Sequence, residues 1–230
     1  MAAHTSLAGA FITLEGPDGA GKSTQAERLA TALREDGHVV ELVREPGGTV
    51  LGEQVRGLLL SPDALDHRSK TDALLFNAAR AQLVAEVIRP ALRAGRLVLC
   101  DRYADSTLAY QGFGDGLPVE DLRWLATWST DGLVPDLTVL LDVPEAVGLR
   151  RRGEGPSGEQ TRFERADAAD QAFQARVRAG YLELAQAESA RFRVVDATKE
   201  PEEVAREVHA LVHQCIFERE PSTAAGRMSL

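Results

Sequence analysis

Nine consecutive residues near the start of the chain have the types and the spacing needed to bind phosphate. They are Gly16, Pro17, Asp18, Gly19, Ala20, Gly21, Lys22, Ser23 and Thr24, and they fit the pattern G-x-x-x-x-G-K-[ST]. In this pattern the glycines allow a tight turn whose N–H groups point inward at the positive end of a helix. Lys22 then reaches the β- and γ-phosphates of a nucleoside triphosphate, and the Ser23 hydroxyl binds Mg²⁺. We therefore expect these residues to form a nucleotide site.

A carboxylate and a guanidinium form a second candidate group. Asp101 and Arg102 directly follow the apolar residues Leu97 to Cys100. If that apolar run is a strand beside the phosphate-binding loop, Asp101 can hold the Mg²⁺ shell through water. Arg102 would then bridge the donor and acceptor phosphates and supply positive charge in the transition state. The alternative is a charged turn that faces solvent.

The elements that must position these residues alternate along the chain. Five short apolar runs predict strands, at Phe11–Glu15, Val39–Arg44, Leu97–Asp101, Leu137–Asp142 and Arg193–Asp196. Because these runs lack polar alternation, we expect a parallel sheet with helices on both faces. Helical periodicity predicts helices at Lys22–Glu35, Thr71–Arg93, Arg165–Ser189 and Pro201–Ile216, with a bend at Pro90 in the second. The alternation predicts a doubly wound α/β fold that binds ligands at the carboxyl ends of its strands.

Length and composition narrow the class of protein. The 230 residues suit one domain, which we place at residues 1–217, and the polar tail 218–230 is predicted to be disordered. A formal net charge of −9 argues against a nucleic-acid-binding protein. Cys100 and Cys215 lack the spacing of metal ligands. The sequence shows no secretion signal and no run of about 18 apolar residues, so we expect no membrane association and a cytoplasmic location.

A glycine-rich polar segment, Gly153–Gln160, interrupts the second half of the chain. Arginines stand on both sides of it, at 150, 151 and 152 before the segment and at 162 and 165 after it. One interpretation is a plain linker. In an ATP-binding α/β protein, a flexible loop bracketed by arginines instead predicts a mobile lid, here at about residues 150–165.

Other classes of nucleotide-using protein fit poorly. A GTPase reads guanine with Asn-Lys-x-Asp, but none of Lys22, Lys70 and Lys199 follows an asparagine. Its second motif, Asp-x-x-Gly, is also missing at residues 101–104, which read DRYA. A mechanical ATPase or helicase brings further motifs and a partner interface, for which this chain has little room. A small kinase that acts on a small acceptor remains.

Three longer segments then point to a family. Residues 44–49 (REPGGT), 74–82 (LLFNAARAQ) and 101–112 (DRYADSTLAYQG) closely resemble the thymidylate kinases. Shorter matches at 135–138, 141–144 and 195–197 follow in the family's order, so the resemblance covers about residues 11–211. It implies the P-loop nucleoside-monophosphate-kinase fold and transfer of the γ-phosphoryl group of ATP to thymidine monophosphate (dTMP), with Mg²⁺. It also implies a homodimer, for which Thr71–Arg93 and Arg165–Ser189 are candidate interface helices.

The resemblance further implies which residues bind dTMP. They are Asp18, Glu45, Pro46, Phe76, Arg80, Arg102, Ser106, Thr107, Tyr110 and Gln111. Phe76 would stack on thymine and Arg80 would hydrogen-bond the base edge, and a spacing of four puts both on one face of a helix. Tyr110 would crowd the sugar 2′ position, although packing is nearly as good an explanation. By the same resemblance, Asp18 faces the monophosphate and the loop after Asp196 holds adenine.

Members of the family differ in where they carry one catalytic arginine. Some have it in the phosphate-binding loop, whereas others have glycine there and supply the arginine from the lid. This chain has Gly19, so the lid is expected to provide it, and Arg162 fits best. Thr161 replaces the family's usual aspartate, however, which leaves Arg151, Arg152 and Arg165 as alternatives.

Two other functions stay open at this point. The first is another nucleoside-monophosphate kinase of the same fold, which the pairs Phe76–Arg80 and Thr107–Gln111 disfavour. The second is a catalytically idle nucleotide-binding regulator, which would predict a damaged phosphate-binding loop or a missing Arg102. The sequence shows neither defect.

Overall fold

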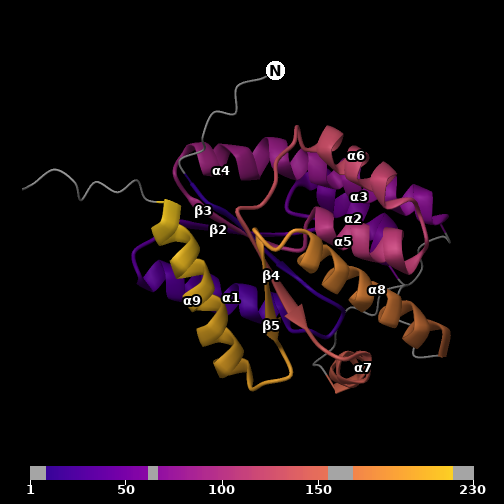
Figure 1. Ribbon diagram of the computed structural model, residues 1–230. Coiled ribbons are helices and arrows are strands. Elements are labelled where there is room, and N and C mark those ends of the chain that lie inside the picture. The colour runs from indigo at the N-terminus through magenta and orange to yellow at the C-terminus, as the bar shows by residue number, and fades with distance from the viewer. Residues whose placement is uncertain (1–8, 62–66, 155–167, 220–230) are drawn as a thin grey trace, which may run out of the picture.

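A five-stranded, all-parallel sheet forms the centre of the molecule (Figure 1). The computed structural model describes residues 9–61, 67–154 and 168–219. The strands are β1 Phe11–Glu15, β2 Val40–Arg44, β3 Leu97–Asp101, β4 Leu137–Asp142 and β5 Phe192–Asp196, in the order β2-β3-β1-β4-β5. This confirms the predicted fold class, with boundaries shifted by one residue at the start of β2 and of β5.

Alternating side chains of the strands are buried on both faces of the sheet. Ile12 and Leu14 of β1 pack against α1 (Lys22–Glu35) and α9 (Pro201–Arg219) on one face. Phe11 of β1 instead joins a core on the other face. That face is covered by helices that include η1, α4, α6 and α8 (Val84–Ile88, Arg89–Arg93, Val119–Ser129 and Ala168–Ala187; Figure 1). The sheet therefore lies between two helical layers, as its apolar strands require.

The long helix predicted at Thr71–Arg93 consists of three consecutive pieces. It begins as α3 (Ser69–Leu83), passes through the π-helical turn η1 and ends as α4. Pro90 lacks an N–H and its ring crowds the carbonyl four residues earlier, which lies in η1. The wider π-helical turn accommodates the proline where the sequence predicted a bend.

Two other helix boundaries differ from the predictions. Helix α8 ends at Ala187 rather than Ser189, and the predicted start at Arg165 lies outside the described residues. Helix α9 continues to Arg219, so the first two residues of the predicted tail are helical. The Gln214 side chain donates a hydrogen bond of 2.8 Å to Glu218, one turn later, which supports this extension. Residues 220–230 lie outside the described part of the chain.

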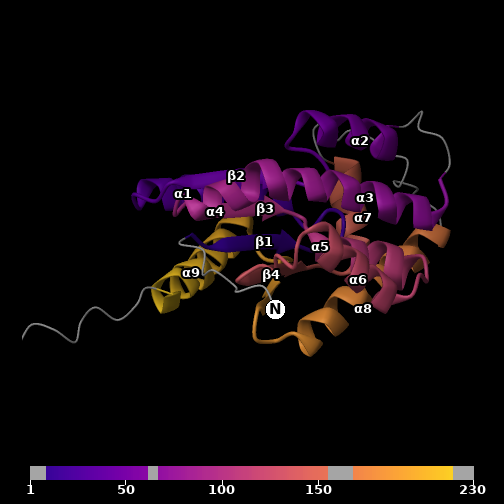
Figure 2. The same cartoon turned by 90° about the horizontal axis from the view of Figure 1, so that it is seen from above.

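Five further helical segments were not predicted. They are α2 (Val50–Leu60), α5 (Ala104–Thr107), η2 (Leu108–Gly114), α6 and α7 (Glu145–Glu154). Residues 150–154, at the start of the predicted lid, form the end of α7, and the rest of the lid lies outside the described residues. Figure 2 shows α2 outside α3, away from the sheet, where Val55 and Leu59 pack against Ala79. Among the described residues, no helix combines the length and apolar character needed to cross a membrane.

Candidate active site

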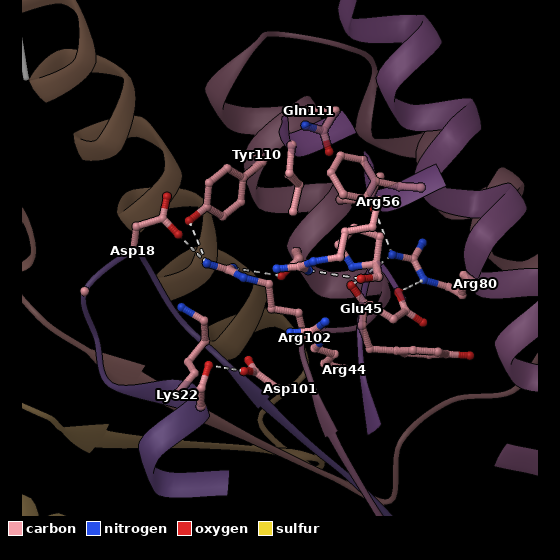
Figure 3. Close-up of a pocket in the computed structure, with 18 of the residues that line it drawn as sticks. Asp18, Lys22, Arg44, Glu45, Arg56, Arg80, Asp101, Arg102, Tyr110 and Gln111 are labelled. Atoms are coloured by element: carbon pink, nitrogen blue, oxygen red, sulfur yellow. Dashed lines mark hydrogen bonds and ion pairs between the residues drawn. The ribbon is translucent and has the colours of Figure 1, made fainter. Parts of the chain in front are cut away.

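One cavity of about 460 Å³ lies where the carboxyl ends of β1 and β3 meet (Figure 3). The two ends coincide because Leu14 of β1 lies opposite Asp101 of β3 in the sheet. Most of the predicted site residues line the cavity, namely Asp18, Gly19, Gly21, Lys22, Ser23, Thr24, Glu45, Pro46, Phe76, Arg80, Asp101, Arg102, Ser106, Thr107, Tyr110 and Gln111. Segments far apart in sequence thus converge at the sheet edge that the predicted topology singled out.

The phosphate-binding loop begins at the end of β1 and leads into α1. Gly21 is the N-cap of α1, with a left-handed φ of 85° that glycine adopts without strain. Pro17 does not line the cavity, but its carbonyl accepts a hydrogen bond of 2.8 Å from the Lys22 ammonium group. Gly16 and Ala20 also lie behind the cavity surface, and Ala20 is buried. The loop thus presents some predicted residues to a ligand and uses others to hold its own shape.

The surroundings of Lys22 make its ammonium group easier to deprotonate. Burial, and then the positive charge of Arg102, lowers the pKa of Lys22 to about 8. The nearby carboxylates of Asp18 and Asp101 act in the opposite direction. An anionic ligand in the cavity would favour the charged ammonium form.

Ser23 and Asp101 provide oxygen ligands of the kind that Mg²⁺ prefers. The Ser23 hydroxyl donates a hydrogen bond of 2.5 Å to the Asp101 carboxylate, which places both oxygens at the loop end of the cavity. A hydroxyl and a carboxylate are typical of a site in which Mg²⁺ keeps several waters and the phosphates of its substrate. The side chains present therefore fit the magnesium complex of a nucleoside triphosphate.

The backbone of α7 lies so close to the phosphate-binding loop that position 19 must be glycine. Gly19 has a φ of +77°, and a Cβ built on it would lie 2.2 Å from the carbonyl oxygen of Gly148 in α7. A side chain at position 19 would therefore collide with the backbone of α7. The loop has no room for an arginine here, which agrees with the interpretation made from the sequence.

Arg102 lies at the middle of the polar network. Its φ of +70° is left-handed, a strained conformation for a residue with a side chain. One terminal nitrogen, Nη1, donates to the Gly16 carbonyl at 3.2 Å and to the Ser106 and Tyr181 hydroxyls. The other, Nη2, pairs with the Asp18 carboxylate and donates to the Tyr110 hydroxyl at 3.2 Å (Figure 3). The guanidinium is thus fixed between the phosphate-binding loop and η2.

Arg80 is committed mainly to protein partners. It is only 1% exposed, and its Nε donates to the Glu45 carboxylate at 2.7 Å. Its terminal nitrogens donate to the Asn77 side chain, the Tyr103 carbonyl and the Thr107 hydroxyl, each at 3.1 Å. Among the described residues, these bonds use four of the five guanidinium N–H groups. One N–H group is left that could reach the edge of a base.

Glu45 follows β2 and carries the cis peptide bond to Pro46. Its Oε1 atom is buried with no hydrogen-bond partner among the described residues. Burial raises the pKa of Glu45 to about 7, although the Arg80 guanidinium lowers it. Phe76 lies one helical turn before Arg80 on α3 and is partly exposed at the cavity wall.

The sequence did not identify four of the residues that line the cavity: Arg44, Arg56, Leu60 and Tyr103. Arg44 stands in the first family-like segment, and its cationic side chain was the available signal. Arg56 lies on α2 and donates a hydrogen bond of 3.1 Å to the Pro46 carbonyl. Because α2 was not predicted, nothing in the sequence linked Arg56 to the site. Lys22 and four arginines line the cavity together with the carboxylates of Asp18, Glu45 and Asp101, so cationic side chains are in excess there.

The candidate arginines of the lid are only partly covered by the structure. Arg162 and Arg165 lie outside the described residues, and the side chain of Arg152 is not described. Arg151 lies on α7 and donates a hydrogen bond of 2.8 Å to the carbonyl of Ala197, just after β5. Its guanidinium is therefore next to the loop that the resemblance assigned to adenine.

Comparisons with known proteins agree with the geometry. The family model described as thymidylate kinase matches residues 14–208 of this chain. A thymidylate kinase from Deinococcus radiodurans is 52% identical over 206 residues, which cover 90% of this chain and 97% of the relative. One from Thermomicrobium roseum is 54% identical over 202 residues, covering 88% and 93%. The crystal structure of thymidylate kinase from Ehrlichia chaffeensis is similar with a TM-score of 0.72 and 34% identity, covering 89% of this chain and 98% of that one.

Proposed function

This chain belongs to the thymidylate kinase family and is an ATP:dTMP phosphotransferase, and we propose that the residues of the cavity perform the reaction in the roles that follow. The reaction transfers the γ-phosphoryl group of ATP to the 5′-phosphate of dTMP and gives dTDP and ADP. One observation carries the assignment of roles: a single cavity joins the phosphate-binding loop to Phe76 and Arg80, with Arg102 between them.

ATP binds as its magnesium complex at the loop end of the cavity. The loop N–H groups surround its phosphates, and Lys22 bonds the β- and γ-phosphoryl oxygens. Ser23 and, through water, Asp101 would hold Mg²⁺, which would supply charge neutralisation for the phosphoryl group being transferred. The contact between Arg151 and the Ala197 carbonyl supports an adenine site beside the loop after β5.

The acceptor dTMP binds at the other end. Phe76 stacks on thymine, and the remaining N–H of Arg80 reaches the base edge together with the buried side chains of Thr107 and Gln111. Pro46, Glu45, Ser106 and Tyr110 surround the sugar and phosphate, and Arg44 and Arg56 add positive charge. The acceptor phosphate is already anionic, so positioning and charge neutralisation carry the catalysis.

Arg102 acts on both phosphates. Asp18 and Tyr110 orient its Nη2 edge, so that the guanidinium can bridge donor and acceptor. A lid arginine supplies further charge, and we assign it to Arg162, with Arg151, Arg152 and Arg165 as alternatives. Truncating Arg162 is expected to lower kcat by roughly 10²- to 10⁴-fold, as loss of a transition-state charge does. An unchanged kcat would move the role to one of the other three.

The test of the substrate is a coupled ADP-release assay with MgATP and six acceptors: the monophosphates of thymidine, deoxyuridine, uridine, cytidine, adenosine and guanosine. Strong turnover with dTMP and weaker turnover with deoxyuridine monophosphate supports the pocket built on Phe76 and Arg80. Equal turnover with another base would support kinase activity but contradict recognition of thymine by this pocket. ATP binding without acceptor-dependent release of ADP would contradict the kinase function and favour the nucleotide-binding regulator.

The enzyme is further proposed to be a homodimer in the cytoplasm. Large apolar side chains are exposed on two helices that pack together, Leu74 on α3 and Trp124 and Trp128 on α6. The two indole rings stack with their centroids 6.1 Å apart. Such a patch favours the α3 side of the molecule over α8 as the interface, since Leu182 on α8 is only 37% exposed.

A further inference from the structure

Glu15, the last residue of β1, has a buried carboxylate that the roles above do not use. Its side chain is 0% exposed, and it accepts three hydrogen bonds. Oε1 accepts from the backbone N–H of Tyr103 at 2.7 Å. Oε2 accepts from the Ser106 hydroxyl at 2.6 Å and from the Tyr181 hydroxyl at 2.9 Å. A buried carboxylate is costly unless it is bonded, so these three hydrogen bonds offset the cost of burying Glu15.

All three donors also determine where Arg102 lies. The Ser106 and Tyr181 hydroxyls each accept a hydrogen bond from Nη1 of Arg102, at 3.1 and 3.3 Å. Tyr103 directly follows Arg102, whose backbone is left-handed. The bond from the Tyr103 N–H to Glu15 therefore fixes the strained backbone, and the two hydroxyls fix the side chain.

We propose that Glu15 is the positioning residue for Arg102: it acts through Ser106, Tyr181 and the Tyr103 backbone to hold the guanidinium where the donor and acceptor phosphates meet. The Ser106 and Tyr181 hydroxyl oxygens also lie 2.8 Å apart. When both hydroxyls donate to Glu15, their oxygens can still accept from Arg102. The inference rests on the proposed role of Arg102 in phosphoryl transfer. It predicts that losing Glu15 reduces kcat rather than substrate binding.

Groups with opposite effects on its pKa surround Glu15. Burial, and then the negative charge of Asp105, raises the pKa of Glu15 to about 7. Asp105 is itself buried and makes two bonds to the Arg191 guanidinium, at 2.7 and 2.8 Å. Arg191 pairs with Asp105 and also with Glu188. The positive charge of Arg102 acts on Glu15 in the opposite direction to Asp105 and favours its carboxylate form.

A double-mutant cycle with Glu15→Gln and Arg102→Ala tests the inference. Glutamine keeps the size of the side chain but cannot accept from all three donors. In the wild-type background, Glu15→Gln is expected to lower kcat by about 10- to 100-fold, with the KM values for ATP and dTMP changed by less than about threefold. In the Arg102→Ala background, the same change should lower kcat by less than about twofold, because the group it positions is gone.

A matched control is Asp136→Asn. The Asp136 carboxylate bonds the same strand at its other end, where it accepts from the Phe11 N–H at 2.8 Å. Its loss is expected to lower the melting temperature without changing kcat by more than about twofold. If Glu15→Gln fails to fold, Glu15→Asp keeps the charge but shortens the side chain away from the two hydroxyls, and it should show the same loss of kcat, again only when Arg102 is present.

The possible results separate this inference from the function it rests on. Equal loss of kcat from Glu15→Gln with and without Arg102 would overturn the inference, and so would an unchanged kcat in the wild-type background. An unchanged kcat in Arg102→Ala alone would instead overturn the role assigned to Arg102. Absence of dTMP turnover by the wild-type enzyme would overturn the proposed function itself.

Discussion

At the scale of single residues, Lys22 gives the cavity a pH dependence. Its pKa of about 8 means that the ammonium is charged at pH 7 and loses its proton as the pH rises through 8. We expect kcat/KM for ATP to fall above about pH 8, because that parameter reports the free enzyme. The alkaline limb of kcat should lie at higher pH, since bound triphosphate stabilises the ammonium.

A matched variant for this prediction is Lys22→Arg, whose guanidinium stays charged throughout the accessible range. Its activity is expected to be lower because its geometry differs, but its alkaline limb should disappear. Measuring pH profiles of both enzymes with ATP varied decides the matter. If the limb stays at the same pH in the variant, another group is responsible.

Phe76 should contribute to the affinity for dTMP and little to ATP binding. Its ring is partly exposed at the cavity wall, and an aromatic–base stack is worth about 1–3 kcal/mol. Phe76→Ala is therefore expected to raise the KM for dTMP by about 10- to 100-fold and to leave the KM for ATP within about twofold. Steady-state kinetics with each substrate varied provides the measurement. Parallel changes in both KM values would indicate a general loss of structure.

Sequence reasoning located individual site residues unevenly, and the cause is physical. The phosphate-binding loop is local, so nine adjacent residues are enough to predict it, and the structure brings Ser23 and Asp101 together as expected. Glu15 is different, because its partners Tyr103, Ser106 and Tyr181 are far from it in sequence. Read alone, it is the last residue of an apolar strand. The parallel pairing of β1 with β3, which the strand's own residues do not reveal, brings Glu15 next to the segment that follows β3.

At the scale of elements, the ion pair of Glu45 and Arg80 joins the end of β2 to α3. Both side chains are almost fully buried, and burial raises the pKa of Glu45 from 4.5 to about 7. A carboxyl group with a raised pKa stabilises the fold at low pH and loses that contribution as the pH rises through the folded-state pKa. The wild-type protein should therefore lose stability relative to Glu45→Gln as the pH rises from 5 to 8.

The expected size of this change follows from the shift. A displacement of roughly 2.5 pKa units corresponds to about 3 kcal/mol in the difference between the two free energies of unfolding. Urea unfolding of both proteins at pH 5, 6, 7 and 8 measures it. A difference that is constant over this range would show that Glu45 is ionised throughout and that Arg80 outweighs the cost of burial.

The prediction of elements was accurate for the uninterrupted apolar runs and for two of the amphipathic helices. All five strands and the helices α1 and α9 appear close to their predicted positions. Residues 104–114, which form α5 and η2, carry four of the site residues but were not predicted as helical. Their sequence, ADSTLAYQGFG, contains two glycines and polar residues that weaken helix propensity. Packing of η2 on α8 stabilises this segment instead, and such tertiary contacts leave no periodic signal.

At the scale of the whole molecule, charge is distributed unevenly. The chain carries a formal net charge of −9, yet Lys22, Arg44, Arg56, Arg80 and Arg102 surround one cavity. The parallel sheet causes this concentration, because it brings the ends of β1, β2 and β3 to one edge. The net charge of the chain gives no sign of this cationic cavity, and the topology was needed to locate it.

The apolar patch of Leu74, Trp124 and Trp128 makes a prediction about assembly. These side chains are 53%, 65% and 69% exposed, and burying two indoles removes a large apolar area from water. If this face is the proposed homodimer interface, Trp124→Asp combined with Trp128→Asp should convert the protein from dimer to monomer in sedimentation-velocity experiments. A charge in a buried interface without a partner opposes association strongly.

Phe217 on α9 offers the matched control, since it is 70% exposed but stands on the opposite side of the sheet from α6. Phe217→Asp should leave the sedimentation coefficient unchanged, because an isolated exposed aromatic needs no partner. Monomerisation by Phe217→Asp, with the double tryptophan variant still dimeric, would move the interface to α9. A wild-type protein that sediments as a monomer would reject the dimer and leave the tryptophan pair as an exposed patch that requires another explanation.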